Sequence, residues 1–335
     1  MFFKAAVLLK KNKIKVLELK KPELKPHQVF VKIIYSSICH TQLQEIRGRR
    51  GPDKFLPHCL GHEAIGQIIE KHKSVKKVKI KNLVCLSWIN GSGVNAGGIV
   101  YEEKNGLKVN AGPVHTFSEY AVISENKIYK INKNNNLRSK LLLGCALSTA
   151  YNALNNKTNN SKKIIYIIGC GGLGLSCIIV AKNLGYKEII AIDNNKEKLK
   201  TAKKIGATNC FTSIEDVMSD SIIDVLVECT GNIEVLKKAI NLPKNFGGKI
   251  IFIGNYPNKE NILIDPWIII RGVTMTGAWN DSKPFDKSFK KLEKIINDKN
   301  LNFFFGGKFY KLNSISKAIE DFENGKIIRP LLTMI

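Results

Sequence analysis

The sequence predicts an α/β protein with two parts, a β-rich barrel or sandwich and a doubly wound parallel sheet. Three observations support this fold class. Short runs rich in Val, Ile and Tyr, separated by turn residues, fill the first half. After about residue 163, apolar runs alternate with amphipathic helical stretches. A glycine-rich turn joins the first of these runs to the helix that follows it.

The first part covers residues 1–148, and its strands are short. The clearest candidates are "QVFVKIIYS" at 28–36, "AIGQIIEKH" at 64–72, "NLVCLSW" at 82–88 and "SEYAVI" at 118–123. Each combines β-branched or aromatic residues with flanking turn residues, which is typical of strands in all-β domains. A length of 335 residues also exceeds one typical domain and favours two.

The second part has the rhythm of a parallel sheet, in which helices connect successive strands. Two amphipathic stretches, 195–206 and 232–241, carry apolar residues at helical spacing. Strand candidates lie on both sides of them. Six strands with such crossovers predict a doubly wound sheet made of two halves. The six candidates are 163–169, 188–193, 208–213, 222–229, 247–254 and 273–279.

The tail after residue 282 returns to the first part. It contains one more helical stretch at 285–299 and ends in the apolar run 327–335, which we expect to pack on the first domain. The predicted domains are therefore 1–148 together with 282–335, and 149–281 between them.

Composition narrows the classes of function. The net charge is +25, but the lysines are spread along the whole chain without an aromatic-interleaved basic cluster, which argues against nucleic-acid binding. The longest uncharged stretch, 164–181, has four glycines in its middle, which favours a turn over a membrane span. Eight cysteines without a close CxxC pair, and no signal-peptide cleavage pattern, favour the reducing cytoplasm and no disulfide framework.

The glycine-rich turn has the spacing G-x-G-x-x-G. Gly169, Gly171 and Gly174 supply the three glycines, with Gly172 between them. Glycine allows a tight turn, a close approach of the backbone to a pyrophosphate, and close packing of the helix on the sheet. The context adds to the motif, because Asp193 ends the next strand 19 residues after Gly174, where it can bind a ribose hydroxyl pair. Together they predict a dinucleotide site.

A cysteine and histidine set in the first domain predicts a metal site. Cys39 ends a predicted strand, His62 lies in "CLGHEAIG", and Cys145 precedes the second domain. Two Cys and one His are a known ligand set for a catalytic zinc with an open fourth position. Scattered residues of these types can also be buried or surface side chains without a metal, so the local sequences around them carry more weight than the types alone.

Those local sequences resemble the zinc-dependent medium-chain alcohol dehydrogenase family. They occur in the family's order and nearly span the chain. The resemblance implies a GroES-like β-barrel catalytic domain and a Rossmann nucleotide-binding domain. The segments are "CHT" (39–41), "GHEAIG" (61–66), "GCALSTAYNAL" (144–154), "GCGGLGLS" (169–176), "AIDNNKEKL" (191–199) and "IIRPLLTM" (327–334).

The resemblance also implies roles for individual residues. Cys39, His62 and Cys145 hold one catalytic zinc between the two domains, and Glu63 is a neighbouring carboxylate that can approach the metal. Thr41 hydrogen-bonds the substrate alcohol and relays its proton, and Trp88 forms a wall of the substrate pocket. The residues implied for binding NAD are His40, Gly169, Gly171, Gly172, Leu173, Gly174, Asp193, Lys198, Thr230, Gly231, Ile253, Gly254 and Arg329.

Three departures from the family pattern are visible. Gln42 stands where the family usually has an Asp that orients the histidine ligand. Gln44 stands where some members have a His that ends the proton relay, and Gln cannot take up a proton near neutral pH. The segment 90–120 lacks the four cysteines of a structural zinc lobe, so we expect packing, with Phe117 and Tyr120 as anchors, to hold it. This Gly- and Asn-rich insert either shapes the substrate entrance, with His115 contributing, or is a plain surface loop.

The function implied is hydride transfer between NAD and an alcohol, polyol or sugar-derived hydroxyl, in a homodimer or homotetramer. Asp193 favours NAD over NADP, because its carboxylate repels a 2′-phosphate. Two alternatives remain open. One is a zinc-free reductase of the same superfamily. The other is a non-catalytic protein that binds a dinucleotide or a nucleic acid, which the net charge and the two Gln substitutions motivate.

Overall fold

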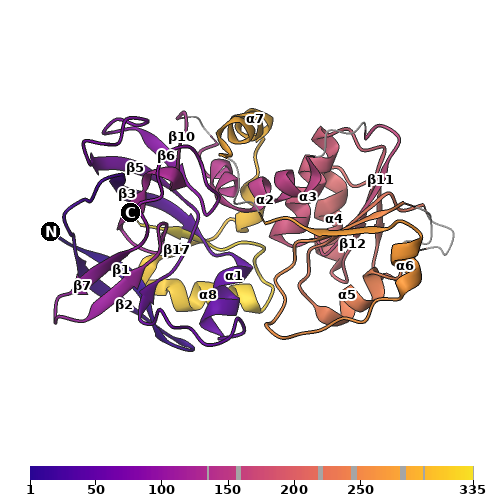
Figure 1. The fold of residues 1–335 in the computed structure, drawn as a ribbon, viewed down its shortest axis with the longest axis horizontal. Helices are drawn as coiled ribbons and strands as arrows, with labels where there is room; N and C mark the ends of the chain where they lie inside the picture. Colours follow the sequence, from indigo (N-terminus) through magenta and orange to yellow (C-terminus); the bar gives the residue numbers. More distant parts are fainter. Residues whose placement is uncertain are drawn as a thin grey trace. The chain divides into compact units, whose positions relative to one another are not determined.

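The computed structural model describes two compact units. Unit 1 comprises Met1–Ser148 and Asp281–Ile335, and unit 2 comprises Thr149–Asn280 (Figure 1). Unit 1 is rich in strands, and unit 2 alternates strands with helices. The described residues are 1–133, 136–155, 160–217, 222–242, 247–279, 284–296 and 299–334.

The first layer of unit 1 is a closed barrel of short strands. In the described residues it has the order β1-β2-β7-β8-β4. Its apolar side chains face inward and form a core that includes Phe3, Leu19, Tyr101 and Val109. The strands are β1 (Phe2–Lys10), β2 (Lys13–Lys20), β4 (His58–Cys59), β7 (Ile99–Glu103) and β8 (Lys108–Ala111).

The insert 90–120 is not a plain surface loop. It supplies β7 and β8, which pair antiparallel and close the barrel. The burial pattern alternates along β7, because Ile99 and Tyr101 point into the core while Val100 and Glu102 point out. Of the two expected anchors, Phe117 is buried, and Tyr120 stacks on Phe30 with ring centroids 5.3 Å apart.

The second layer of unit 1 is a seven-stranded sheet, as far as the chain is described. Its order is β10-β6-β5-β3-β18-β17, and β9 pairs with β3 outside this path. The tail strand β18 pairs antiparallel with β3, which places the end of the chain on unit 1. The strands are β3 (Gln28–Ser37), β5 (Ala64–Lys71), β6 (Leu83–Leu86), β9 (Tyr120–Ser124), β10 (Ile128–Lys130), β17 (Phe309–Lys311) and β18 (Leu331–Thr333).

Three helices complete unit 1. The expected tail helix is α7 (Asp286–Ile296), and it buries Phe289, Leu292 and Ile296. The short helix α1 (His40–Ile46) follows β3 directly, and the sequence did not predict it. A second tail helix, α8 (Ile315–Glu323), was also missed. The apolar faces of α1 and α8 share one core cluster, and Figure 1 shows the two helices side by side.

Unit 2 contains the doubly wound sheet. Its described strands have the order β13-β12-β11-β14-β15-β16, and every neighbouring pair is parallel. All six strand candidates from the sequence are strands in the structure. Their bounds are β11 (Ile164–Ile168), β12 (Glu188–Ile192), β13 (Asn209–Phe211), β14 (Val225–Glu228), β15 (Lys249–Phe252) and β16 (Thr274–Gly277).

The helices between these strands begin at clear local signals. In α4, the Asn195 side chain accepts hydrogen bonds from the backbone N–H groups of Glu197 and Lys198, which fixes the helix start. Asn232 caps α5 in the same way. The helices between the strands are α3 (Gly172–Asn183), α4 (Lys196–Ile205), α5 (Ile233–Ala239) and α6 (Pro266–Ile270), whereas α2 (Ala146–Leu154) precedes β11 and begins in unit 1.

The cysteines and the lengths of the helices relate to two expectations from the sequence, on disulfides and on membrane spans. All eight cysteines lie in described segments, and each has a free thiol. Among the described residues, no helix combines the length and the apolar character that crossing a membrane requires.

Candidate metal centre and nucleotide site

Three connections of unit 1 carry the candidate metal ligands. Cys39 follows β3 and is the N-cap residue of α1. His62 lies in the connection between β4 and β5. Cys145 ends the 3₁₀ turn Ser139–Gly144, just before α2. Residues far apart in the sequence therefore meet because β3 and β5 are neighbours in one sheet.

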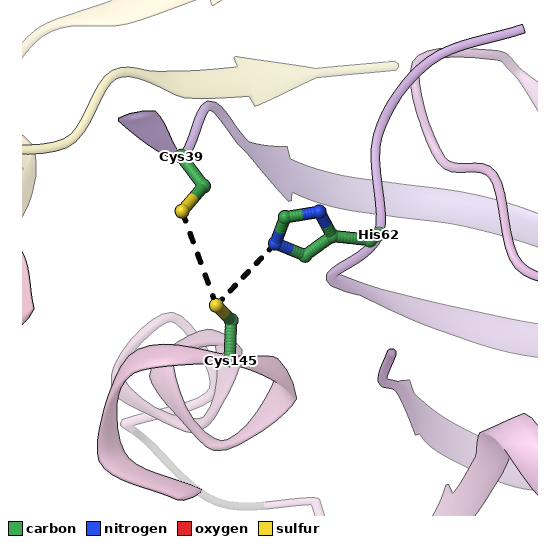
Figure 2. A group of neighbouring side chains, drawn as sticks. All are labelled: Cys39, His62 and Cys145. Atoms are coloured by element: carbon green, nitrogen blue, oxygen red, sulfur yellow. Dashed lines mark hydrogen bonds between the residues drawn. The ribbon is translucent and has the colours of Figure 1, made fainter. Parts of the chain in front are cut away.

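The three ligand atoms fit a zinc ion. In Figure 2 the Cys39 and Cys145 side chains and the His62 ring point toward one another. The two Sγ atoms are 4.0 Å apart, and His62 Nε2 lies 3.3 Å from Cys145 Sγ. Tetrahedral zinc with ordinary bond lengths requires S···S near about 3.8 Å and S···N near about 3.5 Å. Within the described ranges this is the one His, Cys, Asp or Glu group found at metal-binding distances.

The electrostatics of the site favour a thiolate at Cys39, whereas the hydrogen bond with Cys39 and burial raise the pKa of the Cys145 thiol. The hydrogen bond with Cys145 lowers the pKa of the Cys39 thiol well below its ordinary value, against the effect of burial. The positive charge of Arg329 and the His62 ring act in the same direction. Because zinc binds the thiolate and not the thiol, this environment prepares Cys39 for a metal.

Glu63 lies next to His62 and is fully buried. Its Oε1 atom accepts hydrogen bonds from the Ser37 hydroxyl at 2.6 Å and from Arg329 Nε at 2.8 Å. A second guanidinium nitrogen of Arg329 also contacts it. The other oxygen, Oε2, has no hydrogen-bond partner among the described residues. One carboxylate oxygen thus stays available beside the three ligands.

Arg329 belongs to this network. Its side chain is 4% exposed, and it donates hydrogen bonds to Glu63 and Ser37. The family resemblance implied a cofactor contact for this residue. In the structure of unit 1 its evident task is to neutralise the buried Glu63 carboxylate, since an unpaired buried charge is strongly unfavourable.

Gln42 links two of the ligand-bearing segments. It is 2% exposed and lies in the first turn of α1. Its Oε1 atom accepts from the Cys39 backbone N–H at 3.1 Å, and its Nε2 atom lies 2.6 Å from His62 Nδ1. The side chain therefore occupies the position from which the histidine ligand is oriented, as the sequence comparison with the family suggested.

The other predicted site residues of unit 1 lie on α1 or just after β6. Thr41 Oγ1 is 3.8 Å from Cys39 Sγ. His40 opens α1 with an exposed ring that contacts the Phe322 ring edge-on. Gln44 is buried, and its Oε1 atom has no hydrogen-bond partner in the described chain. Trp88 follows β6 and is half-buried.

A cavity of about 990 Å³ in unit 1 reaches this site. Its wall includes His62 and Gln42, and part of the insert 90–120 lines it as well. The wall contains an ion pair between Glu45 and Arg50 at 2.9 Å, and a hydrogen bond between Asp53 Oδ2 and His58 Nε2 at 2.8 Å. The lining residues from the insert are Gly98, Ile99, Val100, Asn110, Ala111, Gly112, Pro113 and Val114.

His115 does not belong to that wall. It is 1% exposed, and the Tyr101 hydroxyl donates to its Nε2 at 2.9 Å. Its Nδ1–H donates to the Gly112 carbonyl at 3.2 Å, and the Val122 N–H donates to the Tyr101 oxygen. Burial lowers the pKa of His115 to about 4. The ring is a neutral, fully bonded part of the barrel core, contrary to the idea that it shapes the substrate entrance.

In unit 2 the glycine turn joins β11 to α3. Gly169 has φ +90°, a left-handed conformation that favours glycine. A Cβ on Gly174 would lie 1.7 Å from the Gly169 carbonyl oxygen, so only glycine lets the helix pack here. A Cβ on Gly171 would meet nothing within 4 Å. The open side at Gly171 is the place where a backbone loop can receive a pyrophosphate.

Asp193 ends β12 beside this turn. Its Oδ2 accepts from the Cys170 backbone N–H at 2.7 Å, and Oδ1 accepts from the Asn195 N–H at 2.9 Å. Lys198 Nζ lies 4.0 Å from Oδ2. The carboxylate is thus fixed against the glycine turn, as the dinucleotide fingerprint requires.

Sequence reasoning missed Glu228, which organises the other expected nucleotide contacts. This fully buried carboxylate accepts from the Thr230 N–H at 2.6 Å and from the Gly231 N–H at 3.3 Å. The Thr230 and Tyr256 hydroxyls also donate to it. A Cβ on Gly254 would come within 2.5 Å of Glu228 Oε2. The segments 230–231 and 253–254 therefore lie close together around one carboxylate.

Both parts of the chain match models of known protein families. Residues 25–133 match the family model of the alcohol dehydrogenase GroES-like domain. Residues 172–297 match the model of the zinc-binding dehydrogenase domain. The chain belongs to the medium-chain dehydrogenase family. The barrel and the parallel sheet agree with the fold that the sequence predicted, and the three predicted metal ligands form a group that could hold a metal ion.

Solved structures share the whole fold of this dehydrogenase. A benzyl alcohol dehydrogenase from Acinetobacter calcoaceticus is 25% identical over 100% of both chains, with a TM-score of 0.85. A protein described as a zinc-binding dehydrogenase, from Sinorhizobium meliloti and bound to NADP, is 20% identical over 99% of both chains, with a TM-score of 0.81. A protein described as a short chain alcohol dehydrogenase, from Escherichia coli and complexed with NADH, has the same identity, coverage and TM-score.

Proposed function

We propose that this dehydrogenase is a zinc- and NAD-dependent oxidoreductase that oxidises an alcohol, polyol or sugar-derived hydroxyl, or reduces the corresponding carbonyl. The observation that carries the proposal is the group of Cys39, His62 and Cys145, whose ligand atoms lie within 4.8 Å of one another beside a buried carboxylate with a free oxygen. The family models that match both halves of the chain support an oxidoreductase.

The residues have separate tasks in this proposal. Zinc held by Cys39, His62 and Cys145 would supply a Lewis acid that lowers the pKa of a hydroxyl group. Glu63 Oε2, which has no hydrogen-bond partner among the described residues, would supply a negative charge near the zinc while the zinc exchanges its ligands. The Thr41 hydroxyl, 3.8 Å from Cys39 Sγ, accepts the proton of the substrate hydroxyl and passes it outward. Trp88 limits the space beside the substrate.

For the nucleotide, we propose NAD bound at the glycine turn, with the adenosine ribose on Asp193 and Lys198. His40, Thr230, Gly231, Ile253, Gly254 and Arg329 are proposed as further contacts. The Asp193 carboxylate is held rigidly by two backbone N–H groups, so a 2′-phosphate would meet a fixed negative charge. The assembly we propose is a homodimer or homotetramer.

The first experiment measures metal content and turnover together. Dialysed protein should contain close to one zinc per chain and reduce NAD with at least one member of a panel of alcohols, polyols and sugars. Cys39→Ser or Cys145→Ser should lower the zinc content toward zero while circular dichroism stays unchanged. Hydride transfer without zinc would instead support a zinc-free reductase, and nucleotide binding without any hydride transfer would support a non-catalytic protein.

A second experiment tests the proton path. Thr41→Ala should lower kcat by about a hundredfold or more, because a positioned acid–base group contributes at least that much. Thr41→Ser retains the hydroxyl and is the matched control. Gln44→Ala should change kcat little, since an amide cannot take up a proton near neutral pH. Full turnover in Thr41→Ala would remove the hydroxyl from the proposal.

A third experiment tests the choice of nucleotide. At equal low concentrations, NAD should be turned over faster than NADP. Asp193→Gly should relax this preference, and Asp193→Asn, which removes the charge but keeps an acceptor, should separate repulsion from structure. Faster turnover of NADP by the unmodified protein would contradict the ribose assignment.

A further inference from the structure

The Gln42 amide lies between two of the proposed metal-binding residues and forms a hydrogen bond with each. On one side is the Cys39 backbone N–H, 3.1 Å from Gln42 Oε1. On the other side is His62 Nδ1, 2.6 Å from Gln42 Nε2. The side chain is 2% exposed, so water does not compete freely for either end. Each end must therefore match the hydrogen-bonding role of its protein partner.

The orientation of the amide follows from the backbone. A peptide N–H can only donate, so the Gln42 atom opposite Cys39 has to be the carbonyl oxygen. The amide NH₂ then faces His62 and donates to Nδ1. The ring proton is consequently on Nε2, from which it can point to Cys145 Sγ at 3.3 Å. With this tautomer, the Cys39 N–H, the Gln42 amide, the His62 ring and the Cys145 sulfur each face a suitable hydrogen-bond partner.

A metal ligand needs the opposite tautomer. His62 Nε2 can bind a metal only through its lone pair, which moves the ring proton to Nδ1. Nδ1–H and the Gln42 NH₂ are then both donors. Turning the amide by 180° satisfies Nδ1–H but places the NH₂ opposite the Cys39 N–H. An amide leaves one mismatched pair in either orientation, whereas a carboxylate accepts at both ends.

We propose that Gln42 favours the metal-free tautomer of His62 and thereby weakens metal binding at this site, so that replacing the amide with a carboxylate tightens it. The inference rests on the proposed zinc function, since it assigns Gln42 a positioning role toward that metal. Partners that orient a histidine ligand typically change metal affinity by about 10-fold to 100-fold when altered. We expect a change of that size.

The tautomer itself is the most direct test. Metal-free protein labelled with ¹⁵N-histidine should show His62 protonated on Nε2, and zinc or cadmium should move the proton to Nδ1. The His62→Asn variant identifies the resonances. In metal-free Gln42→Glu protein, the His62 proton should already be on Nδ1, because the carboxylate accepts it. A wild-type ring protonated on Nδ1 without metal would overturn the inference.

Zinc affinity, measured by competition with a chelator, gives the second test. Gln42→Glu keeps the length of the side chain and should bind zinc about tenfold more tightly or better than wild type. Gln44→Glu is the charge control, because it adds the same charge two residues along α1 at a side chain with no hydrogen bond to His62 among the described residues. Gln44 is buried, so its new charge is screened little, and the gain for Gln42→Glu should exceed the gain for Gln44→Glu.

The outcomes separate the two proposals. Equal affinities for wild type and Gln42→Glu, or equal gains in both Glu variants, would overturn the role of Gln42 while leaving the zinc site intact. Zinc binding by Gln42→Glu but not by wild type would support the inference in its strongest form. If neither protein bound zinc, the proposed function would fall together with the inference.

Discussion

Glu63 in unit 1 and Glu228 in unit 2 are both fully buried carboxylates, but their surroundings differ. Glu63 is neutralised by the guanidinium of Arg329. Glu228 forms no salt bridge with any described residue, and it accepts hydrogen bonds from backbone N–H groups and from the Thr230 and Tyr256 hydroxyls. One carboxylate is held by an opposite charge, and the other by neutral dipoles.

The difference separates a reactive position from a structural one. Both oxygens of Glu228 accept hydrogen bonds, so none remains for other chemistry. Glu63 accepts its hydrogen bonds on Oε1, and its Oε2 has no partner in the described structure. Arg329 therefore neutralises this carboxylate through one oxygen and leaves the second available.

Removing the charge of Glu63 should have the largest effect on stability. Glu63→Gln strands the buried Arg329 guanidinium, and breaking a buried pair in this way costs about 3–5 kcal/mol. Urea unfolding of metal-free protein measures the loss. The double variant Glu63→Gln/Arg329→Met removes the stranded charge and should recover much of the stability. A loss under about 1 kcal/mol in the single variant would contradict the role of Arg329 as the countercharge.

His115 is a buried base whose hydrogen-bond partners, Tyr101 and the Gly112 carbonyl, are neutral, as are the partners of Glu228. Because burial lowers its pKa from 6.5 to about 4, the unfolded chain binds a proton before the folded one does as the pH falls. Stability should therefore decline between pH 6.5 and 4, by up to about 3 kcal/mol in total. Urea unfolding across this range should show a steeper decline for wild type than for His115→Gln. Parallel curves would contradict the assignment.

Neutralising Glu228 should cost less than neutralising Glu63. Glu228→Gln strands no cation, but its new NH₂ group forces one former donor to lose its acceptor, which costs about 1–3 kcal/mol. The same urea experiment ranks the two variants directly. Tyr256→Phe, which removes one donor from the Glu228 cluster, is the matched control for a small loss. A larger loss for Glu228→Gln than for Glu63→Gln would reverse the comparison.

The smallest effect on stability is expected at Gly171. Its backbone has φ −75°, which any residue adopts, and a Cβ there meets nothing within 4 Å. Gly171→Ala should change unfolding by less than about 0.5 kcal/mol. Its affinity for NADH, followed by fluorescence, should nevertheless fall if the pyrophosphate lies against this turn. Unchanged NADH affinity in Gly171→Ala would place the cofactor elsewhere.

Most of the fold could be predicted because its signals are local. The four central strands of unit 2, β11, β12, β14 and β15, are apolar over most of their length, and parallel sheets covered on both faces require such runs. The insert was harder to interpret, since its Gly and Asn residues mask two short strands with alternating burial, β7 and β8. The helix α8 was missed because a short turn precedes it without a side-chain cap.

The metal site also has features that could be predicted from the sequence and features that could not. Cys39, His62 and Cys145 carry recognisable local sequences, so the sequence predicted the group that the structure brings together. The partners of Glu63 and Glu228 could not be predicted, because they depend on long-range packing. Arg329 is 266 positions from Glu63, and Tyr256 is 28 positions from Glu228. The tautomer conflict at Gln42 also depends on a contact between two separate connections.

The pairing of β18 with β3 has a consequence for how the protein is made. Synthesis proceeds from the N-terminus, and domains usually begin to fold as they emerge. The segment that carries Glu63 emerges long before Arg329, and all of unit 2 is synthesised between them. During that interval Glu63 has no guanidinium partner, so it either stays hydrated or takes up a proton. A nascent chain released before Arg329 would lack β18, so Tyr35–Ser37 of β3 would have no antiparallel partner on that side and could pair with another chain.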